Sequence, residues 1–415
     1  MRSRSLASVL VLCLLFIWCT GVLAEKVTLT WTVKTSNQQR IDIWTKWATE
    51  FTKLYPDVEV KLTLPGSGYE AKLKTWIAGG EAPDIMWMGA NFFDFASVLL
   101  PLNDLYSRNK DIKEILPNMI AAHSINGKLL ALPYGVNTHA VFYDQDALDA
   151  SGIKIPKGWT WDDAMKFGKQ LTVDKDGDGV IDRYAYSFFH PTWWWQYGDA
   201  AVYTSDYQKT TVDNPVTIAA IQFWADFFGG RMGVQATPQD SNDILNGKAV
   251  AGNRGIFDVP LYRDKEGLNW DVVDQPLFVY NGKSYYTNFY SAETWTVTKD
   301  TKHPAEALKF MEFIMSKEKN TEFGMLGGII PTQSSVAVKT ILNTSEPKNV
   351  RVFVDCLNYW NYGYFANPAL GVVKAIWANE TFTKIMTGEI PAASGVPEIA
   401  SQVNKALDEY WSNAK

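Results

Sequence analysis

The sequence predicts an α/β protein organised in two lobes. Strand-like and helix-like hydrophobic patterns alternate in the first part of the chain, which is typical of units that build a mostly parallel sheet. The chain has 415 residues, which is more than one hydrophobic core usually serves. Apolar residues make up 47% of it, so core packing can supply the stability of both lobes.

The first 24 residues have the features of a signal peptide. Arg2 and Arg4 form a basic start, and an apolar run follows at residues 6–18. The segment 22–24 (Val-Leu-Ala) places small or apolar residues three and one before a cleavage point, so we expect maturation at Glu25. The apolar run is shorter than the roughly 20 residues that a membrane-spanning helix needs. We therefore expect export across the inner membrane into the periplasm.

A lipid anchor at Cys19 is the competing interpretation of this leader. Lipoprotein cleavage needs a small residue before the cysteine, and Trp18 stands there. No later stretch is long and apolar enough to cross a membrane. A free secreted form is therefore preferred over a tethered one.

Three strand–helix units follow in the first part of the mature chain. Strands are recognised by period-two alternation, and helices by apolar residues three and four apart. Pro56 ends the first helix, and the glycine pair 79–80 ends the second. In chain order we predict a strand at 27–33, a helix at 43–54, a strand at 58–64, a helix at 73–77 and a buried strand at 83–88.

Helix signals dominate the later part of the chain. Thr160 and Asp163 have the spacing of a capping box at a helix start. Further helices are predicted at 218–228 and from Pro304 to 314. No internal repeat, low-complexity linker or heptad pattern interrupts the chain. The lobes are therefore expected to be joined by short crossings.

Charge and cysteine content exclude several classes of protein. Removing Arg2 and Arg4 with the leader leaves 37 basic residues against 45 acidic ones, a formal charge of −8. That acidity argues against a nucleic acid or an anionic membrane as partner. Two of the three cysteines lie in the leader, so Cys356 cannot form an intramolecular disulfide. We predict it to be a small buried residue and not a nucleophile.

Seven sequence fragments resemble those of one known family. In order and spacing they resemble the extracytoplasmic solute-binding proteins of ATP-binding-cassette (ABC) sugar importers, the group that includes maltose-binding protein. The fragments are APDI at 82–85, LPYG at 132–135, FYD at 142–144, WTWD at 159–162, LNGKAVA at 245–251, WTV at 295–297 and GGIIP at 327–331.

The resemblance implies a periplasmic binding protein fold, in which two α/β lobes close on a ligand by hinge motion. We expect an N-terminal lobe from residues 25–138 and 290–330, and a C-terminal lobe from 139–289 and 331–415. Crossings between lobes are expected near 137–141, 288–292 and 328–333. The resemblance further implies a monomeric protein without enzymatic activity or a required cofactor. It would deliver a sugar to the membrane subunits of an importer.

Sugars need aromatic planes together with side chains that donate and accept hydrogen bonds. The chain offers 17 Trp and 19 Tyr, which favours an oligosaccharide. In the triplet at 193–195 the three indoles cannot all face one core, and we assign Trp194 and Trp195 to the ligand. Burial of that element on both faces is the alternative.

Polar candidates follow the predicted strands of the first lobe. Asn37 and Gln38 come after the first strand, at the carboxyl edge where ligands bind open α/β sheets. Capping of the next helix is the alternative role for Asn37. Asn91 and Asn137 match positions where the resemblance implies polar sugar contacts. The best-known sugar binders carry a carboxylate at both, so the amides leave the identity of the sugar open.

The remaining candidates come from the second lobe and the later crossings. For each of them, core packing or ordinary surface is as good an interpretation as ligand contact. They are Arg254, Phe257 and Asp258 after the turn at 247–248, Glu293 and Trp295 at the second crossing, and Trp360, Asn361 and Tyr362 near the end of the chain.

The segment 174–182 reproduces the first part of a calcium-binding loop. Its candidate ligands are Asp174, Asp176, Asp178, the carbonyl of Val180 and Asp182. Position twelve is Ala185, where such loops carry a bidentate glutamate. The segment is either a structural Ca²⁺ site with a ligand missing or a solvated acidic turn.

Two other functions remain open at this point. A secreted glycoside hydrolase also needs aromatic subsites, together with two carboxylates about 5–9.5 Å apart. A binder of a phosphorylated polyol would need a basic cleft, for which Arg254 and Arg263 are the candidates.

Overall fold

The computed structural model describes residues 26–35, 37–187, 202–204, 207–235, 240, 242–288, 290–341, 345–359, 369–373 and 375–413. Its strands are β1 (Val27–Thr32), β2 (Val58–Thr63), β3 (Ile85–Met88), β4 (Ser124–Ile125), β5 (Lys128–Leu129), β6 (Leu132–Asp144), β7 (Tyr184–Tyr186), β8 (Ala249–Gly255), β9 (Trp270–Val273), β10 (Phe278–Tyr280), β11 (Lys283–Tyr285), β12 (Tyr290–Val297) and β13 (Ile330–Pro331).

The helices cover the faces and ends of the sheets. They are α2 (Gln38–Leu54), α3 (Tyr69–Ala78), α4 (Asn103–Arg108), α5 (Pro117–Ala122), α6 (Gln145–Ala150), α7 (Trp161–Leu171), α8 (Pro215–Phe228), α9 (Val259–Arg263), α10 (Pro304–Ile314), α11 (Lys317–Gly324), α12 (Ser334–Thr340), α13 (Val352–Asp355), α14 (Leu370–Val373), α15 (Glu380–Thr387) and α16 (Ala392–Asn413). Short 3₁₀ helices are η1 (Ala90–Val98), η2 (Ile112–Glu114), η4 (Ile256–Asp258), η5 (Cys356–Tyr359) and η6 (Ile376–Ala378).

The predicted α/β class is confirmed by the sheet order. The main sheet runs β2-β1-β3-β12-β6-β8-β7, with β9 and β13 also paired to β6. β1 pairs in parallel with β2 and β3, as the three strand–helix units predict. β12 then pairs antiparallel with both β3 and β6, which makes the sheet mixed.

Local sequence explains how the first helices form. Asn37 caps α2 by accepting a hydrogen bond from the backbone N–H of Arg40 at 3.1 Å. The buried face of α2 consists of Trp44, Trp47, Ala48 and Phe51, with the spacing of one helical stripe. The capping box of Thr160 and Asp163 at the start of α7 is also present, as the sequence predicts.

The aspartate of the APDI fragment joins three segments of the first lobe. Its Oδ2 accepts hydrogen bonds from the backbone N–H and the hydroxyl of Thr30 in β1, each at 2.8 Å. Its Oδ1 accepts from the hydroxyl of Thr301, just before α10, at 2.5 Å. Asp84 therefore satisfies a backbone donor at the sheet and fixes the entry into β3.

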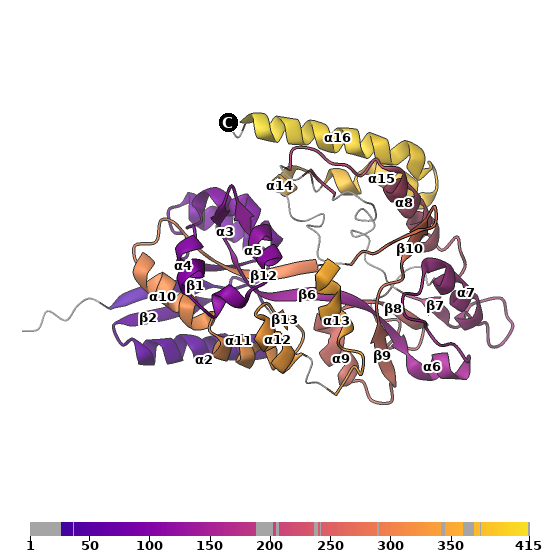
Figure 1. The fold of residues 1–415 in the computed structure, drawn as a ribbon, viewed down its shortest axis with the longest axis horizontal. Coiled ribbons are helices and arrows are strands. Elements are labelled where there is room, and N and C mark those ends of the chain that lie inside the picture. Colours follow the sequence, from indigo (N-terminus) through magenta and orange to yellow (C-terminus); the bar gives the residue numbers. More distant parts are fainter. Residues whose placement is uncertain are drawn as a thin grey trace, which may run out of the picture.

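β6 runs through the middle of the molecule and changes partners along its length (Figure 1). Its first half pairs with β12 up to Thr138, opposite Tyr290. From His139 onward it pairs with β8, and from Val141 also with β9. β13 pairs with β6 at Gly135 and Val136. The change of partner at Thr138 coincides with the first crossing expected from the sequence.

Two large hydrophobic cores pack against this strand. The first gathers Trp31, Trp44, Trp295 and Phe323 with side chains of β6 and α10, and it continues through η4, α9 and β9. The second is built mainly from α7, α8, α15 and α16 (Figure 1). α12 contacts α11, and Ala337 belongs to the first core.

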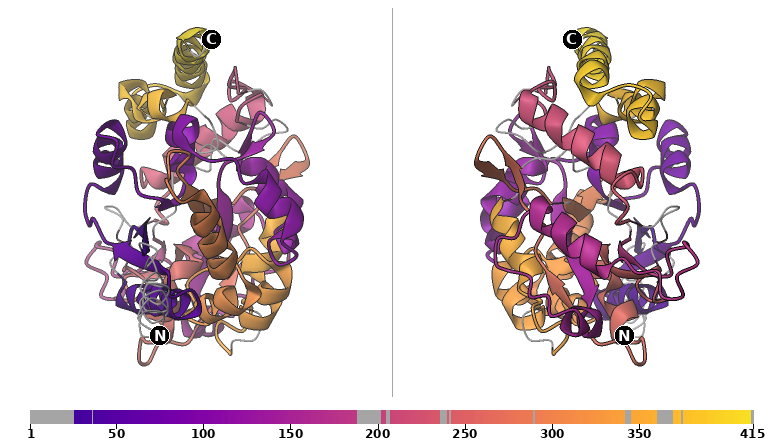
Figure 2. Two further views of the ribbon diagram at one scale, coloured as in Figure 1. Left: turned by 90° about the vertical axis from the view of Figure 1, so that its left-hand side faces the viewer. Right: turned by 90° about the vertical axis from the view of Figure 1, so that its right-hand side faces the viewer.

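The C-terminal helices lie at one end of the molecule. Figure 2 shows α15 and α16, in yellow, on the opposite side from the indigo α2. The thiol of Cys356 is fully buried, as predicted, and burial raises the pKa of that thiol. None of the helices in the described ranges is long and apolar enough to cross a membrane. The predicted signal peptide lies outside those ranges.

Candidate functional site

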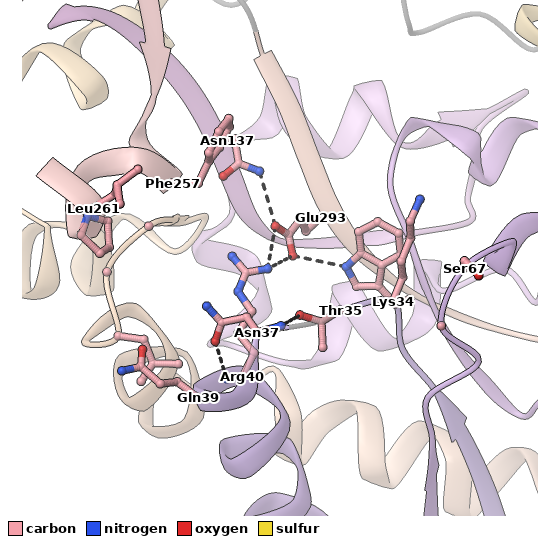
Figure 3. A pocket seen from close by; sticks show the side chains of 16 residues that line it. Lys34, Thr35, Asn37, Gln39, Arg40, Ser67, Asn137, Phe257, Leu261 and Glu293 are labelled. Carbon is pink, nitrogen blue, oxygen red and sulfur yellow. Dashed lines mark hydrogen bonds and ion pairs between the residues drawn. The ribbon is translucent and has the colours of Figure 1, made fainter. Parts of the chain in front are cut away.

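A cavity of about 740 Å³ lies where β6 and β12 run side by side (Figure 3). The start of α2 and the turn before α3 form one wall, and η4, α9 and the loop after α11 form another. Its described lining residues are Lys34, Thr35, Asn37, Gln39, Arg40, Gly66, Ser67, Trp87, Asn137, Phe257, Pro260, Leu261, Glu293, Leu326, Gly327 and Gly328.

A single carboxylate forms the centre of the polar floor. Glu293 on β12 accepts hydrogen bonds from the Arg40 guanidinium at 3.0 Å to each oxygen. Its Oε2 also accepts from the Tyr134 hydroxyl at 2.5 Å and from the Trp87 indole N–H at 3.3 Å. Its Oε1 accepts from Asn137 Nδ2 at 3.4 Å. Four side chains from α2, β3 and β6 thus converge on one acidic group.

Burial and charge act together on the groups around this carboxylate. Burial alone would lower the pKa of the Arg40 guanidinium, but the Glu293 carboxylate outweighs it and that pKa is raised. Burial, followed by the same carboxylate, raises the pKa of the Tyr134 hydroxyl well above its ordinary value. Arg40 therefore stays charged, and Tyr134 stays a neutral donor.

Both cations of the described lining are paired. Arg40 forms an ion pair with Glu293 at 3.0 Å, with both side chains largely buried. Lys34 forms an ion pair with Glu70 at 2.7 Å, and its ammonium lies 5.8 Å from the centre of the Trp87 ring. The local charge is therefore close to balanced in this part of the cavity.

The opposite wall is apolar and unusually exposed. Phe257 in η4 is 48% exposed, and Leu261 in α9 is 51% exposed. Gly328 has a φ of +73°, and a Cβ there would lie 3.5 Å from the Phe257 backbone. Glycine at this position allows the loop after α11 to approach η4 closely. The cavity thus combines a polar floor with an apolar side.

Four residues predicted from the sequence line this cavity: Asn37, Asn137, Phe257 and Glu293. Asn37 also caps α2, so the two alternatives for that residue are compatible. Gln38 is a correction, because its side chain donates to Asp42 at 2.7 Å on the outer face of α2. Its neighbour Gln39 lines the cavity instead.

Trp295 is a second correction. It is 1% exposed and stacks on Tyr134 with a ring separation of 4.6 Å. Edge contacts with Trp31 and Trp44 complete its surroundings in the first core. Strand alternation puts Trp295 on the same face of β12 as Glu293, but two residues farther along the strand, where Trp44 of α2 covers it.

Arg254 and Asp258 are also placed away from the cavity lining. Arg254 is 3% exposed, and its guanidinium donates to the backbone oxygen of Asn253 at 2.7 Å. Asp258 is half-buried, and burial raises the pKa of its carboxyl while Arg254 opposes that shift. Both side chains belong to the packing around β8 and do not line the cavity.

The other predicted contacts lie in parts that are only partly described. Asn91 falls in η1, directly after β3, where the backbone is described and the side chain is not. Trp194 and Trp195 lie outside the described residues. The same holds for Trp360, Asn361 and Tyr362. These assignments remain predictions.

Sequence reasoning missed Trp87 and Arg40. The run at 83–88 predicts a buried strand, yet Trp87 is only half-buried between the buried Met86 and Met88. Period-two alternation would have placed Trp87 on the opposite face. Arg40 lies on the first turn of α2, one turn after Asn37, and no local motif marks it.

The acidic loop brings three of its predicted ligands together. Carboxylate oxygens of Asp174, Asp176 and Asp182 lie within 4.8 Å of one another. The N–H groups of Gly179 and Gly177 donate to Asp174 at 2.9 and 2.7 Å, and these bonds lower the pKa of its carboxyl. Asp178 is not part of this group, and its Oδ1 accepts from the Val180 N–H at 2.7 Å.

Comparison with known proteins identifies the same architecture. The family of bacterial extracellular solute-binding proteins matches residues 46–348, or 303 of the 415 residues. An ABC substrate-binding protein of Listeria monocytogenes, solved in complex with cycloalternan, superposes with a TM-score of 0.74 at 20% identity. The superposition covers 92% of this chain and 100% of that one. At this identity the likeness concerns the fold.

Two curated relatives are similar in sequence over part of their lengths. An arabinooligosaccharide-binding protein of Bacillus subtilis is 30% identical over 148 residues, which cover 34% of each chain. A protein of the same description from Halalkalibacterium halodurans is 22% identical over 307 residues, covering 68% of this chain and 66% of that one. The chain thus spans about a third to two thirds of these relatives.

Proposed function

Because the chain belongs to the family of bacterial extracellular solute-binding proteins, we propose that it captures an oligosaccharide in the cavity where β6 and β12 run side by side. Capture occurs by hinge closure, and the closed form delivers the sugar to the membrane subunits of an ABC importer. The protein acts as a monomer in the periplasm after removal of its signal peptide.

The composition of the cavity carries this proposal. Trp87 and Phe257 offer ring surfaces for the apolar faces of a sugar, and Leu261 extends the apolar side. Asn37, Gln39 and Asn137 offer amides, each of which can donate and accept hydrogen bonds. A volume of about 740 Å³ suits more than one sugar ring. The arabinooligosaccharide-binding relatives add support for an oligosaccharide.

The paired cations favour a neutral ligand over a phosphorylated polyol. Arg40 is held by Glu293, and Lys34 by Glu70. An anion would have to compete with these carboxylates for its positive partners, so binding it would leave a buried acidic group uncompensated. Arg254 is buried and is not among the described lining residues, so it adds no positive charge to the described part of the cavity.

Capture without chemistry agrees with the family, whose members are binding proteins. Glycoside hydrolysis needs an acid and a nucleophile or base, both carboxyl groups. Among the described lining residues, Glu293 is the one carboxylate, and its oxygens are occupied by donors from four side chains.

The route of the chain supports hinge motion. β6 continues from its pairing with β12 and β13, near the floor of the cavity, to its pairing with β8 and β9. Bending of these strands would change the separation of α2 from η4. A sugar that contacts both sides then favours the closed form by its differential affinity.

Calorimetric titration of the mature protein with mono- and oligosaccharides, followed by product analysis, tests this function. We expect saturable binding of an oligosaccharide, weaker binding of its component monosaccharides, and sugar recovered unchanged. Cleaved sugar would move the protein to the hydrolases. Binding of a phosphorylated polyol in preference to every neutral sugar would overturn the assignment of ligand class.

For the loop at 174–182, we propose a structural Ca²⁺ site. The carboxylates of Asp174, Asp176 and Asp182 supply the hard oxygen ligands that this ion prefers. Gly177 and Gly179 adopt φ of +75° and +89°, which lets the chain turn tightly around the carboxylates. Ala185 stands at the twelfth position and has no carboxylate to offer. The affinity should therefore be low.

Removal of calcium is expected to lower the melting temperature by roughly 1–3 °C, because a weakly bound ligand stabilises the folded state only modestly. Differential scanning calorimetry with 1 mM Ca²⁺ and with excess chelator measures the shift. The Asp182→Asn variant serves as control, because it should melt at one temperature in both buffers. An identical melting temperature of the parent protein with and without chelator would refute the site.

A further inference from the structure

Glu293 has no free hydrogen-bonding capacity left for a ligand. A carboxylate offers about four lone-pair positions. Oε2 accepts from Arg40, Tyr134 and Trp87, and Oε1 accepts from Arg40 and Asn137. These donors belong to three different elements, α2, β3 and β6. This geometry suits a carboxylate that orients neighbouring side chains, and it does not suit one that contacts the sugar directly.

The orientation of the Asn137 amide depends on this carboxylate. Its Nδ2 donates to Glu293, so its Oδ1 must point to the other side of the amide. Asn137 lines the cavity, is only 7% exposed, and its Oδ1 has no hydrogen-bond partner in the described structure. A buried acceptor left unpaired is costly, so such an atom calls for a partner.

We propose that Glu293 is a positioning residue that determines whether Asn137, on the cavity floor, presents a hydrogen-bond donor or an acceptor to the ligand. By holding Nδ2 of Asn137, it presents Oδ1 as a fixed acceptor, so the ligand must bring a donor to this point. A free hydroxyl of a neutral sugar is such a donor, and it reaches Oδ1 after a small shift of the surrounding side chains. This inference rests on the proposed sugar-binding function and specifies one of its contacts.

Substitution of Glu293 by glutamine should exchange the hydrogen-bond acceptor that Asn137 presents to the cavity for a donor. In Glu293→Gln, one oxygen becomes an NH₂ group, which repels the other donors and turns the Asn137 oxygen toward residue 293. Nδ2 of Asn137 then faces the cavity, so a ligand hydroxyl must act there as acceptor. The hydroxyl can accept there, but its proton then loses the acceptor that Oδ1 had provided, so we expect affinity for the best sugar to fall at least tenfold.

Asn137→Asp in the same background should restore binding. A carboxylate at position 137 can accept from the new amide at position 293 with one oxygen and present the other to the ligand. In the parent background, Asn137→Asp places a second carboxylate against Glu293 and should weaken binding on its own. The double variant is expected to lie within about threefold of the parent affinity, a coupling that two independent losses would not produce.

Calorimetric titration of the mature parent protein, both single variants and the double variant tests the proposal, with melting curves to show that each is folded. Glu59→Gln, an exposed acid on β2, serves as control for loss of one charge. Weak singles with a restored double support the inference. If the parent binds sugar but the double variant does not recover, the positioning role is wrong and the proposed function stands. If the parent binds none of the sugars, both the positioning role and the proposed function are wrong.

Discussion

Replacement of Trp295 by alanine is expected to lower the free energy of unfolding by about 3–5 kcal/mol. The indole is 1% exposed and lies among Trp31, Trp44 and Tyr134 at ring separations of 5.2, 5.6 and 4.6 Å. Truncation leaves a cavity in the centre of the first core, where β12 and α2 meet. These large rings cannot close such a space without moving the strand.

Chemical denaturation followed by circular dichroism measures this loss. Val279→Ala, at a position 42% exposed on the β10–β11 hairpin, should change stability by less than about 0.5 kcal/mol. A Trp295→Ala protein as stable as this control would contradict the placement of Trp295 in the core. It would then return Trp295 to the set of candidate ligand contacts.

Replacement of Trp87 by alanine is expected to weaken sugar binding by about 30-fold, because an aromatic anchor at the centre of a site contributes about 2 kcal/mol. The indole lines the cavity, and its N–H donates to Tyr134 at 3.1 Å and to Glu293 at 3.3 Å. Truncation removes a ring surface for the sugar and one of the hydrogen-bond donors to Glu293 on the cavity floor.

Titration calorimetry separates these two contributions. Trp87→Phe keeps a ring but loses the N–H, and we expect it to lose less affinity than the alanine variant. Trp76→Ala, which removes a half-buried indole of α3 outside the cavity lining, should bind as the parent does. Equal affinities for Trp87→Ala and Trp76→Ala would remove Trp87 from the site.

Patterns that depend on neighbouring residues were readable from the sequence. Period-two alternation located β1 and β2, and the spacing of Trp44, Trp47 and Phe51 located the buried face of α2. The Thr160–Asp163 capping box also formed as predicted. These signals are local, because a strand or helix period and a cap are completed within a few residues. The order of the seven family fragments extended the prediction from these local elements to the whole fold.

Which aromatic residues face the cavity was not readable from the chain. Trp87 and Trp295 are opposite each other on the paired strands β3 and β12, yet Trp87 lines the cavity and Trp295 is in the core. Residues directly opposite on antiparallel strands point to the same face of the sheet, so alternation cannot distinguish these two indoles. The difference follows from which elements cover that face over each strand, and local pattern does not specify this.

Local sequence patterns suffice to predict the α/β class, the first helices and strands, and the residue types suited to a sugar. The convergence of side chains on Glu293 is visible only in the folded chain, where its partners are Arg40, Trp87, Tyr134 and Asn137. Arg40 and Glu293 are 253 residues apart in sequence and in direct contact. Contacts at such separations arise from the pairing of β12 with β3 and β6, since only strand register brings their side chains to the same point.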